Sequence, residues 1–329
     1  MTLIILVSLF LLAFYLSLAL GAQKLSLKDI FQNPEANFSK TIFFKIRLPR
    51  TLLVLISGAL LAGAGTLFQM FFRNPLAEPG IMGITSGASL GAVIAASFGG
   101  GAFCCGLISL LNAGAFFGAL LAALLVTAIS FKISKSSTVA LLLCGTALGS
   151  LYSAITSIML AINDRQLNSI YFWMLGSFSG RGWNELKFIF LPSLVALFFM
   201  IISIPQLDLL SSGEATARTL GVNVNSLRIK VIVAGAFATS AAVCAGGTIG
   251  FVGLIAPHAI RQITGVKGKE LLPLSMTAGP VLLLFSDTLC RLVIAPAELP
   301  VGTVTAILGV PFFISLLLTS FNERKSAKF

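Results

Sequence analysis

Long uncharged apolar intervals recur along this chain of 329 residues and limit the folds that it can adopt. The interval Thr51–Phe72 is long enough for one membrane crossing, because about 20 apolar residues at a rise of 1.5 Å span a hydrocarbon core of ~30 Å. Hydrophobic residues make up 57% of the chain and charged residues 10%, whereas soluble domains carry roughly 25% charged residues. A water-soluble globule is therefore excluded. The intervals that predict membrane helices are Met1–Gln23, Thr51–Phe72, Pro79–Phe131, Ser136–Asn163, Phe188–Leu207, Val231–Ile260, Leu271–Ser286 and Leu299–Asn322.

Two of these intervals are longer than one crossing needs. The interval Pro79–Phe131 is interrupted by Gly99-Gly100-Gly101, and the interval Val231–Ile260 contains Gly246-Gly247 and Pro257. With helices ending at these glycines, about ten hydrophobic helices fit the chain, a few of them short. The sequence therefore predicts an all-α polytopic membrane protein that forms a single transmembrane domain over residues 1–329.

Small residues are concentrated inside the apolar intervals, as in Gly58–Gly65 and Gly114–Gly118. Such strings let helix backbones approach one another closely in lipid. The five cysteines lie within or at the ends of apolar runs and lack metal-ligand spacing, so they indicate neither a metal site nor a disulfide framework. His258, the single histidine, has no neighbouring Cys, Asp or Glu, and we expect it to be structural. No cofactor is expected.

The net charge of +11 belongs mainly to basic residues that flank the apolar intervals. Such residues contact anionic headgroups, and no basic run interleaved with aromatic residues indicates nucleic-acid binding. The chain also lacks a Gly-x-x-x-x-Gly-Lys-Ser/Thr loop, so it has no phosphate cradle for ATP. It contains no paired carboxylates, Ser/His arrangement or metal cluster, and no catalytic residue is therefore assigned.

Charged and structured segments bracket the run Thr51–Phe72. Arg47-Leu48-Pro49-Arg50 precedes it, and Pro49 suits the first turn of a helix because its missing N–H costs nothing there. The polar loop Arg73–Gly80 follows the run. We therefore expect arginines at one membrane surface and a structured loop at the other.

A polar interval, residues 208–228, separates two apolar runs. Ser211 or Ser212 can cap a short helix with Glu214 in its first turn, and Gly221 can end that helix in a left-handed conformation. A second short helix, capped by Asn223 or Asn225, can follow. The segment is predicted to form a compact knob on the membrane surface.

About ten spans place both termini on one side of the membrane, and the positive-inside rule favours the cytoplasm. The basic segment Lys24–Arg50 then falls on the outer face. An acidic partner on that side would account for it, since complementary charges guide docking.

Two further features concern single helices. Asp287 and Arg291 are spaced i, i+4 and can form an ion pair, either structural or functional. The aromatic segment Tyr171–Gly176 fits an interfacial belt or a short helix at the mouth of a pathway.

The sequence resembles the FecCD family of permeases, the membrane subunits of type II ATP-binding-cassette importers for iron–siderophore complexes, haem and cobalamin. The segments that carry the resemblance extend over nearly the whole chain: Arg47–Arg50, Arg73–Gly80, Gly213–Gly221, Gly250–His258 and Ala297–Gly302. In such importers a loop with the Glu-Ala-x-Ala-x-x-x-Gly order enters a cleft on the ATPase subunit.

The resemblance implies the type II importer permease fold with ten helices in a multi-pass protein of the bacterial inner membrane. It implies as partners two ATP-binding subunits, a periplasmic or lipid-anchored substrate-binding protein and a second permease copy, identical or a close paralogue. By matching position, the binding protein docks on Arg47, Arg50 and Arg291. The coupling residues are Ser212, Gly213, Glu214, Ala217, Arg218 and Gly221, and the cytoplasmic gate comprises Asn74, Leu76, Ser137 and Thr138.

The function expected from this resemblance is permeation of a metal chelate, powered by separate ATPase subunits. A ferric siderophore is the leading cargo, with haem and cobalamin as alternatives. An ion-coupled secondary transporter is a distant alternative that needs ionisable residues within the spans, of which Asp287 stands out.

Overall fold

The structure is a computed structural model of the chain and describes residues 2–21, 23, 37–99, 103–104, 108–133, 138–162, 167–265 and 268–326. Within these ranges lie ten helices of 13 residues or more, which agrees with the predicted all-α fold. They are α1 (Thr2–Ala19), α4 (Leu48–Phe72), α5 (Ile84–Gly99), α6 (Leu110–Ile133), α7 (Thr138–Ile162), α9 (Trp183–Ser211), α11 (Val224–Gly246), α12 (Val252–Thr264), α13 (Leu271–Leu292) and α14 (Val301–Ser326).

Short elements connect these helices. They are α3 (Asn37–Thr41), the π-helix η1 (Ile42–Arg47), the 3₁₀-helices η2 (Pro79–Met82) and η4 (Gly268–Glu270), α8 (Leu167–Met174), α10 (Glu214–Thr219), and the two-residue strands β1 (Phe103–Cys104) and β2 (Ile108–Ser109). The strands pair antiparallel between α5 and α6. In the part of the chain described, six helices are long and apolar enough to cross a membrane, and three shorter apolar helices accompany them.

The glycine breaks predicted from the sequence are present. Helix α5 ends at Gly99, and α11 ends at Gly246, after which Gly247 has a φ of 72° that favours glycine. Pro257 does not end a helix, because it lies inside α12. The two long intervals therefore each contain two helices.

Pro49 lies in the first turn of α4, as predicted, but the helical segment begins earlier in the chain. A continuous helical segment runs from Phe38 to Phe72, and Pro49 lies within it, near the start of α4. A proline inside a helix lacks one hydrogen bond and crowds the preceding turn. Here the π-helical turn η1 directly precedes α4, and such wider turns accommodate an altered hydrogen-bond pattern.

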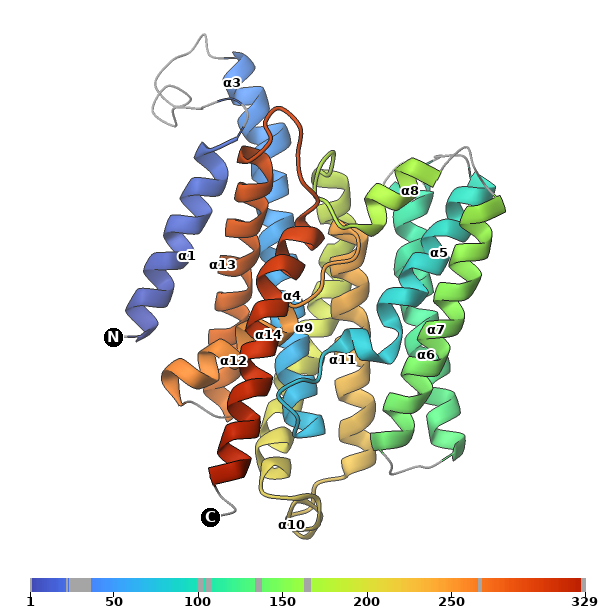
Figure 1. Cartoon of the computed structure of the whole chain (residues 1–329), viewed down its shortest axis with the longest axis vertical. Coiled ribbons are helices and arrows are strands. Elements are labelled where there is room, and N and C mark those ends of the chain that lie inside the picture. The colour runs from blue at the N-terminus through green and yellow to red at the C-terminus, as the bar shows by residue number, and fades with distance from the viewer. Residues whose placement is uncertain are drawn as a thin grey trace.

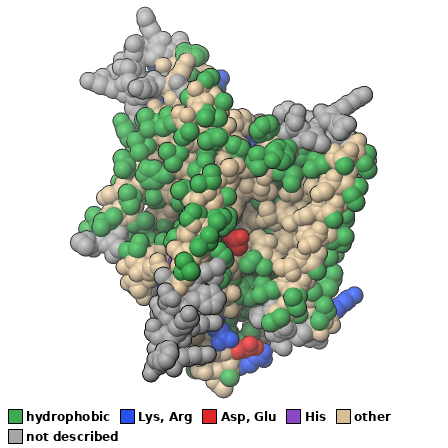
Figure 2. Space-filling view, viewed as in Figure 1, with side chains coloured by type: hydrophobic (Ala, Val, Ile, Leu, Met, Phe, Trp, Pro, Cys, Tyr) green, Lys and Arg blue, Asp and Glu red, His purple; other side chains and the backbone are tan. Residues whose placement is uncertain are grey.

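Helices α4 and α11 form the core of the bundle. In each of them 78% of the apolar window is buried, compared with 28% in α7 and in α9. Figure 1 shows the group α5, α6 and α7 on one side of these two helices and α1, α12, α13 and α14 on the other. Much of the middle of the visible face is hydrophobic, and charged side chains gather at the end that carries α10 (Figure 2).

Glycine backbones in contact hold α4 to its neighbours. A Cβ atom on Gly65 would lie 1.8 Å from the carbonyl oxygen of Gly253 in α12, and one on Gly58 would lie 2.9 Å from that of Gly279 in α13. Gly114 and Gly118 of α6 meet Gly91 of α5 in the same way. The small-residue strings are thus sites of close helix packing, as predicted.

The two ends of the bundle carry different features. In Figure 1, α3, the beginning of α4 and α8 lie at one end, called here the α3 end. Helix α10 and the last residues of α14 lie at the opposite end, the α10 end (Figure 1). The arginine motif and the polar knob predicted from the sequence therefore lie at opposite ends of the molecule.

Candidate functional site

Arg50 is the centre of an ion cluster at the α3 end. Its Nη2 atom lies 2.8 Å from Oδ1 of Asp287, and its Nη1 atom lies 2.9 Å from Oε1 of Glu298. The second carboxylate oxygen of Asp287 lies 3.1 Å from Nε of Arg291, which confirms the pair predicted from the i, i+4 spacing. Asp287 has no exposed surface, so it is held between two guanidinium groups inside the protein.

The other two arginines predicted for docking bind the end of α1. Arg47 donates hydrogen bonds to the carbonyl oxygens of Leu18 and Ala19, at 2.9 and 2.7 Å. Arg291 donates to the carbonyl oxygen of Leu20 at 2.9 Å. The last carbonyls of a helix lack partners within the helix and attract positive charge. The two arginines therefore attach the end of α1 to η1 and α13.

Arg47, Arg50 and Arg291 thus lie together, and each of the three is 6% exposed or less. The cluster reaches the surface through Glu298, whose side chain is 28% exposed. Glu298 also lines a cavity of about 370 Å³ beside Phe172 and Ser177. No role for Glu298 was expected from the sequence, although it lies in the segment Ala297–Gly302 that carries the family resemblance.

The short helix near the α10 end forms, but its beginning differs from the prediction. Gly213, with a φ of 115°, precedes α10 in place of a capping serine, and Ser212 ends α9 instead. A φ in this range is open to glycine and strained for other residues. The expectation of a serine cap was therefore wrong, because the residue before α10 is Gly213 in a conformation that favours glycine.

Helix α10 presents charge on one side and buries the other. Glu214 and Arg218 form an ion pair of 2.8 Å, with side chains that are 39% and 49% exposed. Ala217 is fully buried, and Gly221 has a φ of 84° after the helix. The second predicted helix is not separate. Asn223 caps α11 itself and accepts a hydrogen bond from the N–H of Ser226 at 3.1 Å.

The loop after α4 contains the predicted gate residues Asn74 and Leu76. Arg73 ends α4 in the left-handed conformation, with a φ of 49°. The side-chain oxygen of Asn74 accepts a hydrogen bond from the N–H of Leu76 at 3.0 Å, which fixes the turn. Thr138 is the first residue of α7, and Ser137 lies outside the described residues.

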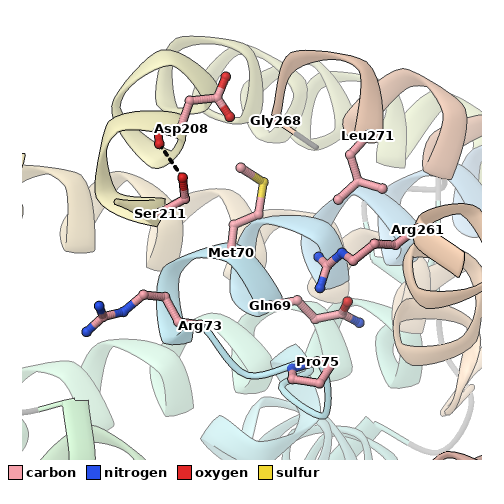
Figure 3. Close-up of a pocket in the computed structure, with 9 residues that line it drawn as sticks. All are labelled: Gln69, Met70, Arg73, Pro75, Asp208, Ser211, Arg261, Gly268 and Leu271. Carbon is pink, nitrogen blue, oxygen red and sulfur yellow. Dashed lines mark hydrogen bonds between the residues drawn. The ribbon is translucent and has the colours of Figure 1, made fainter. Parts of the chain in front are cut away.

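A cavity of about 540 Å³ lies between this loop and the end of α9. Figure 3 shows the side chains of Gln69 and Arg261 pointing toward one another and the guanidinium of Arg73 pointing away from Arg261. Asp208 and Ser211 of α9 line the same cavity, and Asp208 accepts a hydrogen bond from the backbone of Lys269. The cavity thus lies beside the last residues of α9, which directly precede the turn into α10 at Gly213. The sequence did not reveal it because its residues come from four separate segments.

Glu78 attaches the gate loop to the start of α12. Its carboxylate accepts a hydrogen bond from the backbone N–H of Phe251, and burial raises the pKa of this carboxyl group above its usual value. Phe251 has a φ of 68°, unusual for a bulky side chain. Gln69 donates to the carbonyl oxygen of Gly253 at 3.2 Å. The gate loop, α4 and the start of α12 are therefore linked.

His258 packs as an aromatic residue. Its ring centroid lies 5.8 Å from that of Phe312 in an edge-to-face arrangement, and the residue is 9% exposed. Among the described residues, no group of three His, Cys, Asp or Glu side chains is placed to hold a metal ion. This geometry agrees with the structural role expected for His258.

The chain is similar in sequence to a known family of transport proteins. Residues 9–319 match the FecCD transport family. The chain is 36% identical to the Hemin transport system permease protein HmuU of Yersinia pestis, over 93% of this chain and 91% of that protein. It is 39% identical to the Fe(3+)-citrate import system permease protein YfmE of Bacillus subtilis, over 86% of this chain and 83% of that protein.

A solved structure has the same fold. It is reported as an inward-facing conformation of a metal-chelate type ABC transporter, and it is 34% identical with a TM-score of 0.85. The match covers 97% of this chain and 99% of the other. Together with the helical bundle and its two distinct ends, these likenesses show that the chain belongs to the FecCD transport family and is a transport permease of an ABC importer, not an enzyme.

Proposed function

We propose that this permease carries a ferric siderophore across the membrane. A substrate-binding protein delivers the siderophore, and two separate ATP-binding subunits power its transport. The observation that carries the proposal is the position of the charged helix α10 at the end of the bundle opposite the beginning of α4 (Figure 1), where Arg50 lies. The names of the relatives include hemin, Fe(3+)-citrate and cobalamin as cargo. Haem and cobalamin are therefore the alternative cargos.

At the α10 end, we assign Ser212, Gly213, Glu214, Ala217, Arg218 and Gly221 to the contact with an ATP-binding subunit. The ion pair of Glu214 and Arg218 is exposed and can exchange partners, whereas Ala217 anchors the helix in the bundle. A push on α10 acts on the end of α9, which lines the cavity beside the gate loop. Movement of the ATP-binding subunits would thus open and close the gate formed by Asn74, Leu76, Ser137 and Thr138.

At the α3 end, we assign docking of the binding protein to Arg47, Arg50 and Arg291. The guanidinium groups of Arg50 and Arg291 pair with the carboxylates of Asp287 and Glu298. Arg47 instead binds carbonyl oxygens at the end of α1, so the three arginines exceed the two carboxylates by one positive charge. Glu298 is the partly exposed partner. An acidic side chain of the binding protein would replace Glu298 on Arg50, and complementary charge sets the docking register.

In this arrangement the α3 end faces the periplasm and the α10 end the cytoplasm of a bacterial inner membrane. The C-terminal end of α14 lies at the α10 end (Figure 1), and both termini are assigned to the cytoplasm. A second permease copy, identical or a close paralogue, completes the pathway. The exposed apolar helices α7 and α14 offer surface for it.

Reconstitution into proteoliposomes tests the transport proposal. We expect uptake of a ferric siderophore only when the ATP-binding subunits, ATP and a loaded binding protein are all present. Uptake driven by an ion gradient without ATP would instead support a secondary transporter. Since Asp287 is held between two arginines, it is not placed to carry a proton or sodium ion through a cycle.

The cargo and the docking site need separate measurements. Titration of the cognate binding protein with ferric siderophore, haem and cobalamin identifies the cargo as the ligand with the highest affinity. For docking, Arg50→Glu is compared with Lys187→Glu, which changes an exposed lysine in the first turns of α9. We expect only Arg50→Glu to weaken binding of the binding protein, and equal affinity for both variants would remove the docking assignment.

A further inference from the structure

An apolar groove runs between α6 and α11, away from the sites described above. It has a volume of about 450 Å³ and is lined by residues that include Leu124, Ala128, Ile229, Val233 and Phe237. Leu124 and Ile229 on its edges are 63% and 49% exposed. The groove is therefore open at the surface of the bundle.

The floor of the groove is buried and carries almost no polar atoms. Ala123, Ile232 and Ala236 form it, each 5% exposed or less. The hydroxyl of Thr127, which also lines the groove, donates to the carbonyl oxygen of Ala123 at 2.6 Å. This bond satisfies the hydroxyl within α6, so the groove can hold a hydrocarbon chain without leaving a polar group unpaired.

Positive charge lies at one end of the groove. Lys132 is exposed and follows Ala128 by four residues, so it continues the same stripe of α6. Arg228 precedes Ile232 by four residues on α11, and its guanidinium carbon lies 5.7 Å from the ring centroid of Phe131 in α6. Arg228 thus crosses from α11 to α6 and is buried between them, with 1% of its surface exposed. Because α11 begins just after α10, this charged end belongs to the α10 end of the bundle.

We propose that the groove binds one anionic phospholipid, with an acyl chain between α6 and α11 and the phosphate on the exposed Lys132, near the buried positive charge of Arg228. An apolar channel that ends in basic side chains matches a lipid in both polarity and order along the bilayer normal. Basic pockets between membrane helices are known to hold anionic headgroups. The bound lipid would touch α6 and α11 next to the coupling helix, a role beyond the transport function proposed above.

Lipid retention by the purified full-length protein tests the headgroup site. Native mass spectrometry counts phosphatidylglycerol and phosphatidylcholine of equal chain length that remain bound. We expect phosphatidylglycerol to be retained preferentially, and Lys132→Gln to lower that preference by about fivefold, as one basic residue near the surface contributes. Lys187→Gln, a change in an exposed lysine on α9, is the matched control and should leave the preference unchanged.

A second variant tests the groove itself. Ala128→Trp fills the groove from an exposed position and should lower retention of both lipids. Leu191→Trp adds bulk to an exposed apolar position of α9 and should not. Equal retention of the two lipids by the native chain, or undiminished retention by Ala128→Trp, would overturn the proposal. Dissociation of a permease dimer by Ala128→Trp would also overturn it, because the groove would then be an interface between copies.

Discussion

Arg50 of α4 and Asp287 of α13 are 237 positions apart in the chain and form a buried ion pair of 2.8 Å. Asp287 also pairs with Arg291, so one carboxylate compensates two guanidinium groups that have lost most of their contact with water. Breaking a buried pair by removing one partner leaves an uncompensated charge, which costs far more than the loss of an exposed pair. The fold at the α3 end therefore depends strongly on Asp287.

Replacement of Asp287 by Asn should destabilise the protein by about 3–5 kcal/mol, because Arg291 then has no carboxylate and Arg50 keeps only Glu298. Thermal unfolding of the purified protein in detergent measures the effect. Glu214→Gln, which breaks the exposed pair with Arg218, is the control and should cost at most about 1 kcal/mol. Equal shifts in melting temperature would contradict the asymmetry between the two pairs.

Glu214→Lys should reduce the affinity for the ATP-binding subunits about tenfold or more and leave the fold intact. The new lysine faces Arg218 at i, i+4 on an exposed helix, and such like-charge pairs cost only about 0.5 kcal/mol. Co-purification with the ATP-binding subunits measures the interaction. Lys187→Glu near the α3 end also reverses one exposed charge, in the opposite sense, and should have no effect. Retained association with Glu214→Lys would show that α10 is not the contact.

Gly65→Ala should unfold the protein or prevent its assembly. The added methyl would overlap the carbonyl oxygen of Gly253, so α4 and α12 would have to separate. Overpacking of a core costs about 1–3 kcal/mol even where side chains can adjust, and here the obstacle is backbone. Gly250→Ala, at a position with nothing within 4 Å, is the matched control. Expression and the melting temperature of the two variants give the comparison.

Glu78→Gln should remove a pH-dependent part of the stability. Because burial raises the pKa of Glu78 in the folded protein, the folded state binds this proton more tightly than the unfolded state. The resulting stabilisation is present at low pH and is lost as the pH rises through the raised pKa. The melting temperature of the native chain should therefore fall more between about pH 5 and about pH 8 than that of Glu78→Gln. Identical profiles would contradict the raised pKa.

The sequence sufficed for features whose cause is local. Uncharged runs located the long helices, glycines located the ends of α5 and α11, and the spacing of Asp287 and Arg291 predicted their pair. Each of these depends on residues within one or two helical turns or on one continuous interval. The start of the helical segment at Phe38 was missed because Lys40 and Lys45 interrupt its apolar pattern.

Features that depend on packing between distant segments were not predictable from one sequence. The bond of Arg50 to Glu298 joins residues 248 positions apart, and no pattern in either segment indicates it. The cavity beside the gate loop and the attachment of Glu78 to Phe251 likewise need several helices in place. The predicted start of α10 was wrong for another reason. The two serines suggested a helix cap, whereas the conformation of Gly213 determines the turn before the helix.

The glycine contacts of α4 have a mechanical consequence. A helix of 25 residues is about 38 Å long at 1.5 Å per residue, and α4 extends from the arginine cluster to the gate loop. At Gly58 and Gly65 its backbone packs directly against the backbones of α13 and α12. We expect α4 to move together with α12 and α13, so that a displacement at its arginine-bearing end reaches the loop at its opposite end.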